Sequence, residues 1–160
     1  MVPIEKLFLD QLKDWPTAAK NYQDLKYIEC KEIQYAGFKI KIQYNPERIR
    51  SSAAPVDKQS LNKRPCFLCA ENRPTEQRWI DYPPHYSILV NPYPIFSQHL
   101  TIPDKRHLPQ LIQGRIADML HLAIDLPGYT LLYKGPRSVA SAPDHFHFQA
   151  GPKGVLPIEH

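Results

Sequence analysis

The chain has 160 residues, of which 42% are apolar and 22% charged, the size and composition of one soluble globular domain. Its 20 basic and 16 acidic residues give a net charge of +4 and are scattered along the chain, so no nucleic-acid-binding arm is expected. No apolar run approaches the roughly 18 residues that span a membrane. The first 15 residues carry acids and no small-residue cleavage site. These features predict a cytoplasmic protein without a membrane contact.

The N-terminal part of the sequence predicts helices followed by a hairpin. Apolar residues at helical spacing indicate an amphipathic helix over residues 4–14, which Pro16 ends, and a second short helix beginning at Pro16. Residues 27–35 and 38–44 alternate apolar and polar side chains around Ala36-Gly37, a pattern typical of a β-hairpin. Cys30, alone on the first of these strands, is expected in the core.

The remaining elements are shorter and are separated by proline-rich chain. Residues 45–85 have no clear periodicity and many turn formers, so irregular backbone that is either functional or disordered is expected there. Strands are predicted at 86–90 and 99–103, a helix with one buried face from 108 to 126, and further strands at 129–134 and 145–150. Strands with segregated helices indicate one α+β domain over residues 1–160 with a mostly antiparallel sheet.

Residues 144–149, DHFHFQ, form the most informative segment. Because alternate side chains of a strand point to one face, His145, His147 and Gln149 would share a face, with the two phenylalanines in the core behind them. Such a row of polar groups on a rigid element suits nucleophilic catalysis. The alternative is a half-buried strand that carries two exposed histidines.

Cys66 and Cys69 form a C-x2-C pair, which in a reduced compartment is either half of a zinc site or a redox pair. The pair follows Arg64-Pro65 in irregular chain rather than opening a helix, which favours zinc. His107 and His145 are available as further ligands, and a Cys2His2 set has no open position for water. The zinc would therefore be structural and would tie the 45–85 segment to the sheet.

Three motifs occur in a recognisable order: CFLCAENRP at 66–74, TIPDKRHLPQL at 101–111 and DHFHFQ at 144–149. They resemble the C-F/Y-L-C-x-x-N, P-D-H…L-P-E/Q-L and H-P-H-x-Q elements of the galactose-1-phosphate uridylyltransferase-like branch of the histidine-triad superfamily. The H-F-H-F-Q spelling is closer to the GDP-hexose phosphorylases of that branch. HLTIPDKRH also resembles the G-H-x-L-x-I-P-K-R-H segment of small histidine-triad proteins. The resemblance covers about residues 64–151 and implies a histidine-triad-like fold.

The resemblance also implies residue roles. It makes His147 the nucleophile and places Gln149 against the phosphoryl oxygens. The metal ligands that it implies are Cys66, Cys69, His107 and His145. The PDKRH segment differs by one residue from the uridylyltransferase spacing, so Lys105 and His107 compete for the ligand register, and only the histidine suits zinc.

The implied chemistry is attack of a neutral imidazole on the α-phosphorus of a nucleotide, which forms a covalent nucleotidyl-histidine. Glutamine at position 149 cannot donate a proton to a leaving group as a third histidine would. Stable anionic leaving groups need none, so transfer to phosphate or a sugar phosphate is favoured over hydrolysis. Candidate substrate contacts are the polar residues of neighbouring turns: Asn91, Lys134, Arg137 and Ser141. Arg48, Arg50, Ser51, Ser52 and Arg73 could line the cleft.

The sequence thus predicts a nucleotidyltransferase or phosphorylase that acts on a nucleoside diphosphate sugar or a dinucleoside polyphosphate, with phosphate or a sugar phosphate as acceptor. The alternatives are a hydrolase of similar phosphoanhydrides and a nucleotide- and zinc-binding module without turnover. Proteins of this branch commonly contain two copies of the unit. The chain is therefore expected to be the N-terminal part of a longer protein or to complete its site as a homodimer.

Overall fold

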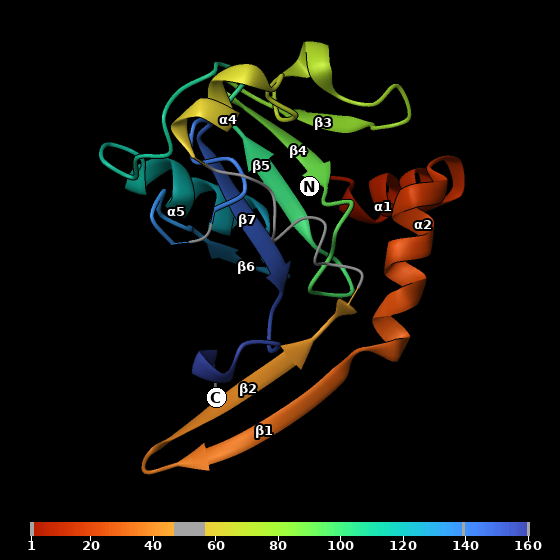
Figure 1. The fold of residues 1–160 in the computed structure, drawn as a ribbon, viewed down its shortest axis with the longest axis vertical. Coiled ribbons are helices and arrows are strands. Elements are labelled where there is room, and N and C mark those ends of the chain that lie inside the picture. The colour runs from red at the N-terminus through yellow and green to blue at the C-terminus, as the bar shows by residue number, and fades with distance from the viewer. Residues whose placement is uncertain (1, 47–56, 139, 160) are drawn as a thin grey trace.

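The structure is a computed structural model that describes residues 2–46, 57–138 and 140–159. Its strands form a five-stranded antiparallel sheet, ordered β3-β4-β5-β7-β6, and a separate hairpin of β1 and β2 (Figure 1). The α+β class with a mostly antiparallel sheet is confirmed. The elements are α1 (Ile4–Asp14), α2 (Pro16–Gln23), η1 (Asp24–Tyr27), β1 (Glu29–Tyr35), β2 (Phe38–Tyr44), α4 (Lys58–Lys63), η3 (Ala70–Asn72), β3 (Trp79–Tyr82), β4 (Tyr86–Val90), β5 (Leu100–Pro103), α5 (Ile116–Asp125), β6 (Tyr129–Leu132), β7 (His147–Pro152) and η4 (Pro157–Glu159).

The register of the sheet separates a core face from a site face, because directly paired residues lie on the same side. The core face carries buried apolar side chains of the three central strands: Ile88, Val90, Leu100, Ile102, Phe148 and Ala150. Apolar residues of α1, α2 and α5 pack into the same cluster, among them Ile4, Leu7, Phe8, Tyr22 and Leu122. The opposite face carries Leu89, Thr101, Gln149 and Leu132 in one row, and Pro103 beside His147. His147 and Gln149 therefore project away from the main core.

The hairpin of β1 and β2 extends away from the five-stranded sheet, and every residue in both strands is exposed (Figure 1). The predicted hairpin is confirmed, with Tyr35 paired to Phe38 beside the turn. Cys30 is exposed, so its predicted place in the core is wrong. An alternating strand pattern specifies which side chains share a face, but not whether other elements cover that face.

The helix predicted from 108 to 126 is shorter than expected. α5 begins only at Ile116, since Pro109 lacks an N–H and Gly114 adopts a φ of 75° that helical residues do not. Its predicted buried face is wrong at several positions: Leu111, Ile116, Leu120 and Ile124 are 57%, 56%, 60% and 72% exposed. Burial on this helix concentrates at Leu122.

Several other boundaries differ from the prediction. Residues 45–85 contain α4, η3 and the edge strand β3 between their irregular parts. The last strand begins at His147 rather than at 145, since the ladder with β5 ends where Pro103 pairs with His147. Within the described ranges, none of the helices has the length and apolarity needed to cross a membrane.

Candidate metal centre and nucleophile

Four side chains from three separate segments meet beside the start of β7. One ligand atom from each of them lies within 4.8 Å of the others: Cys66, Cys69, His107 and His145. Nδ1 of His145 is 3.3 Å from Cys66 Sγ and 3.5 Å from Cys69 Sγ, and Nδ1 of His107 is 3.3 Å from Cys69 Sγ. This cluster could hold a metal ion. Lys105 instead places its Nζ 3.0 Å from Asp81 Oδ1, so His107 occupies the ligand register.

The motif around the cysteines builds a tight knuckle. The Cys69 N–H donates to the Cys66 carbonyl, and Asn72 Nδ2 donates to the same carbonyl at 3.0 Å. Arg73 donates from Nε and Nη2 to the Leu68 carbonyl at 3.1 and 2.8 Å. Asn72 and Arg73 thus hold the backbone that presents both sulfurs. The other basic and hydroxyl residues predicted for the cleft, Arg48, Arg50, Ser51 and Ser52, lie outside the described residues.

The electrostatics of the cluster favour the neutral forms of Cys69 and His145 when no cation is bound. Burial, together with Cys66, raises the pKa of the Cys69 thiol to about 12. Burial also lowers the pKa of His145. Nε2 of His145 donates to the Asp104 carbonyl at 2.8 Å, which leaves the Nδ1 lone pair directed at the sulfurs. A divalent cation here would bind a neutral imidazole directly and would stabilise the Cys69 thiolate, which burial disfavours.

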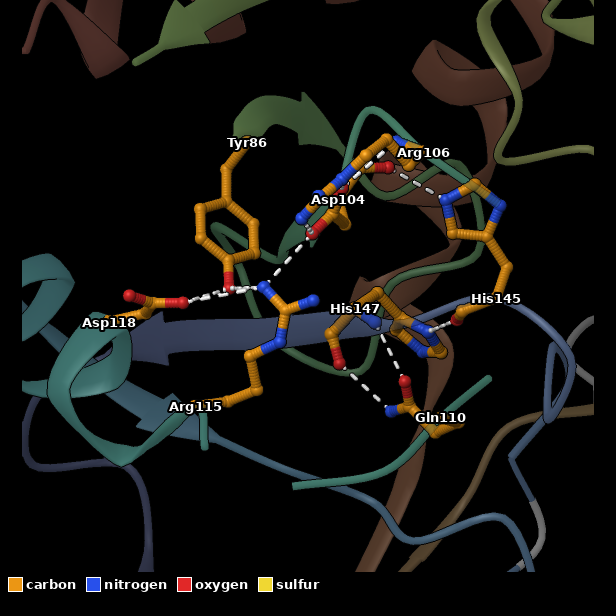
Figure 2. A network of polar contacts seen from close by, with 8 residues as sticks. All are labelled: Tyr86, Asp104, Arg106, Gln110, Arg115, Asp118, His145 and His147. Atoms are coloured by element: carbon orange, nitrogen blue, oxygen red, sulfur yellow. Dashed lines mark hydrogen bonds and ion pairs between the residues drawn. The ribbon is translucent and has the colours of Figure 1, made fainter. Parts of the chain in front are cut away.

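A partly exposed network of ion pairs surrounds Asp104, the residue whose carbonyl accepts from the His145 ring (Figure 2). The Asp104 side chain is fully buried and accepts hydrogen bonds from the Arg106 N–H, Nε and Nη2, while Arg115 Nη1 lies 3.0 Å from its Oδ2. Burial opposes ionisation of Asp104, but the Arg106 hydrogen bonds and the two cations outweigh it and hold the carboxyl pKa below its usual value. The Arg115 guanidinium also lies 4.9 Å from the ring centre of Phe146. The network ties the end of β5 to α5 and to the residue before β7.

His147, the first residue of β7, is fixed by hydrogen bonds to its backbone N–H, to its carbonyl and to one ring nitrogen (Figure 2). Its Nδ1 donates to the His145 carbonyl at 2.9 Å, so the lone pair of the neutral ring is on Nε2. Its side chain is mostly buried, and burial lowers its pKa, which keeps the imidazole neutral near pH 7. The predicted shared strand face holds for His147 and Gln149. It is wrong for His145, which lies before the strand and directs its ring to the cysteines.

Gln149 is oriented by a histidine that the sequence reasoning did not single out. Oε1 of Gln149 lies 3.2 Å from Nε2 of the fully buried His99. Because the Ile95 N–H donates to His99 Nδ1, Nε2 carries the proton and donates to Gln149. The amide NH2 of Gln149 is then the group directed elsewhere. His99 is the first residue of the HLTIPDKRH segment, and its place in that motif could have identified it as a site residue from the sequence.

Phe96 supports His99 and lies against the backbone of β7. Its ring meets the His99 ring edge-on, with 5.3 Å between centroids. A Cβ on Gly151 would lie 2.5 Å from Phe96 Cδ2, closer than van der Waals contact allows. Glycine at 151 therefore makes room for the ring that backs His99.

We expect Gly151→Ala to destabilise the protein by about 1–3 kcal/mol, because the methyl group displaces Phe96. Urea unfolding measures this loss. Gly128→Ala is the matched control, since its added Cβ meets nothing within 4 Å. It should be neutral or stabilising by less than about 1 kcal/mol. Equal stability of Gly151→Ala and the wild type would contradict the steric assignment.

The remaining predicted contacts lie in different settings. Asn91 uses both ends of its amide locally, donating to Thr101 Oγ1 and accepting from the Tyr93 N–H, both at 2.9 Å. Ser141 gives its carbonyl to Arg64 Nη2 at 2.8 Å. Lys134 is half-buried, and its charge acts on His147, while Arg137 is exposed in the turn at 136–138.

Two solved structures are similar to the chain at low identity. The first is a histidine triad protein from Clostridium difficile, 16% identical, with a TM-score of 0.44 over 57% of this chain and 90% of that one. The second is yeast Ap4A phosphorylase in complex with AMP, 15% identical, with a TM-score of 0.49 over 99% of this chain and 53% of that one. The chain thus spans about half the length of the yeast protein. No curated protein sequence matches it. A family model described as a domain of unknown function, DUF4922, matches residues 7–152, and the chain belongs to that family.

Proposed function

We propose that the chain is a histidine-triad-like catalytic domain that transfers a nucleotidyl group through a covalent intermediate on His147. The substrate would be a nucleoside diphosphate sugar or a dinucleoside polyphosphate. One observation carries this proposal: the Nδ1–H of a buried neutral imidazole donates a hydrogen bond to the His145 carbonyl, which leaves the Nε2 lone pair as the nucleophile. The three motifs that resemble those of the uridylyltransferase-like branch support the same function.

The reaction would proceed in two balanced displacements. The Nε2 lone pair of His147 attacks the α-phosphorus, and the bond from that phosphorus to the bridging oxygen breaks. The leaving group departs as a sugar phosphate or nucleoside polyphosphate anion. An oxygen of the acceptor phosphate then attacks the same phosphorus, the P–N bond breaks, and the neutral imidazole is restored.

The charge that develops on the phosphoryl oxygens needs nearby donors. Because His99 occupies Oε1 of Gln149, the NH2 of Gln149 is the part of the amide suited to an anionic oxygen. Lys134 adds a positive charge near His147, which also helps to hold the imidazole pKa down. We propose these two residues as the groups that stabilise the phosphoryl oxygens, and Asn91, Arg137 and Ser141 as further substrate contacts.

The metal would be a structural zinc held by Cys66, Cys69, His107 and His145. Tetrahedral zinc with bonds of about 2.3 Å to sulfur and 2.0 Å to nitrogen requires ligand atoms about 3.3–3.8 Å apart. The three contacts of 3.3–3.5 Å between sulfur and nitrogen fit that requirement. When bound, zinc would supply rigidity at His145. The carbonyl of His145 accepts a hydrogen bond from the Nδ1–H of His147, so a fixed His145 would also fix the orientation of the His147 ring.

Mass spectrometry of the intact protein after incubation with a panel of nucleotide sugars and dinucleoside polyphosphates tests the proposal. A nucleotidyl adduct on His147 is expected, and the added mass identifies the base of the bound nucleotide. Binding of a nucleotide without an adduct or turnover would instead support the non-catalytic binding module.

Acceptor dependence separates transfer from hydrolysis. We expect product to form faster with inorganic phosphate or a sugar 1-phosphate than with water alone, because Gln149 cannot protonate a poor leaving group. Gln149→His should shift the balance toward hydrolysis. Equal product rates with and without acceptor, measured by phosphate release and chromatography, would favour the hydrolase.

A further inference from the structure

Gln110 is a fully buried polar residue in the irregular chain between β5 and α5. Its Oε1 accepts from the His147 N–H at 2.7 Å, and its Nε2 donates to the His147 carbonyl at 2.9 Å and to the Lys134 carbonyl at 3.0 Å. Its own carbonyl accepts from the Tyr133 hydroxyl at 2.8 Å, and its N–H donates to the Pro143 carbonyl. A side chain this well satisfied holds its neighbours in one arrangement.

The register of the sheet shows what this amide replaces. The ladder between β6 and β7 ends where Leu132 pairs with Gln149. Two residues further along, the same antiparallel register would pair Lys134 with His147. At that position the Gln110 amide lies between the two backbones and bonds to both (Figure 2 shows its bonds to His147). It therefore substitutes for a rung of the ladder at the residue that carries the proposed nucleophile.

The three side-chain hydrogen bonds of Gln110, here called the clamp, act on the atoms that determine the orientation of the His147 imidazole. Both backbone hydrogen-bonding groups of His147 bind Gln110, and the ring's Nδ1 binds the carbonyl of His145 just before it. A bond from a residue's ring to the carbonyl two positions earlier depends on the backbone torsions between them. Fixing the N–H and carbonyl of His147 limits those torsions.

We propose that Gln110 is a positioning residue: it maintains the hydrogen bond from the Nδ1–H of His147 to the His145 carbonyl and so keeps Nε2 as the nucleophile. This proposal rests on the proposed function of His147. In this role Gln110 acts through the backbone of His147 and needs no contact with the substrate.

Two substitutions at Gln110 test the clamp. Gln110→Met keeps the length of the side chain and removes all three side-chain hydrogen bonds. Gln110→Glu is the milder change. A carboxyl buried among carbonyl oxygens stays protonated, so it still accepts from the His147 N–H and donates one bond. Gln113→Met is the matched control, because Gln113 is exposed in the same irregular segment.

The decisive measurement is the tautomer of His147, observed through the 15N chemical shifts of its imidazole. The metal content and the thermal unfolding of each variant are measured in parallel. The wild type and Gln113→Met should show the single Nδ1–H form, and Gln110→Met a mixture. Formation of the nucleotidyl adduct in a single turnover should slow about 10–100-fold in Gln110→Met, with a smaller change in KM, and Gln110→Glu should lie between.

An unchanged tautomer in folded Gln110→Met, which lacks all three side-chain hydrogen bonds, overturns the proposal, whatever the rate. A changed tautomer with the wild-type rate of adduct formation overturns the link to the reaction. If the wild type forms no adduct with any nucleotide, the proposed function fails, but the 15N shifts still decide whether Gln110 orients the ring.

Discussion

Replacing His147 by glycine is expected to abolish the covalent nucleotidyl adduct and to leave metal binding and folding intact. The hydrogen bonds to Gln110 use the backbone of His147, which glycine retains. The lost side chain supplies the Nε2 nucleophile. Removal of a positioned nucleophile should lower turnover on the order of 10⁴–10⁶-fold. Free imidazole that enters the vacated space should restore part of the activity, which steady-state kinetics would measure.

His145→Ala provides the contrast, because the two histidines lie only two residues apart. His145 directs Nδ1 to both cysteine sulfurs, so its loss should lower the metal content and the thermal stability together. Activity should fall as a consequence. An adduct that survives His147→Gly and vanishes in a well-folded, metal-loaded His145→Ala protein would mean that the two roles are reversed.

Cys66→Ser is expected to remove the metal and several kcal/mol of stability. Purified wild type should contain about one zinc per chain by elemental analysis. The cation would link the cysteine knuckle to His107 after β5 and to His145 before β7. Loss of one thiolate opens the tetrahedron and leaves the other buried thiol without a cation. Thermal unfolding with and without a chelator measures the loss.

Cys30→Ser is the matched control for this experiment, since Cys30 is exposed on the hairpin and lies outside the cluster. It should keep the metal and the unfolding temperature of the wild type. A wild-type protein that is fully folded and contains no metal would rule out the structural role of zinc.

The sequence alone determined the elements whose pattern is local and the residues that the motifs carry. The helix over residues 4–14 follows from periodicity, which is a property of neighbouring residues. The cluster that could hold a metal was anticipated because a C-x2-C pair and histidines are residue types that suit zinc, and because the motifs resemble those of the uridylyltransferase-like branch. Phe146 and Phe148 were correctly placed in the core, where both are fully buried.

Only the tertiary structure decided what depends on partners far along the chain. The side-chain amide of Gln110 bonds to residues 24 and 37 positions away, and no local pattern encodes such pairs. His99 orients Gln149 from 50 residues away. Cys30 was expected in the core, but burial depends on which elements pack together. Periodicity describes one element at a time, whereas the core and the site form where several elements meet.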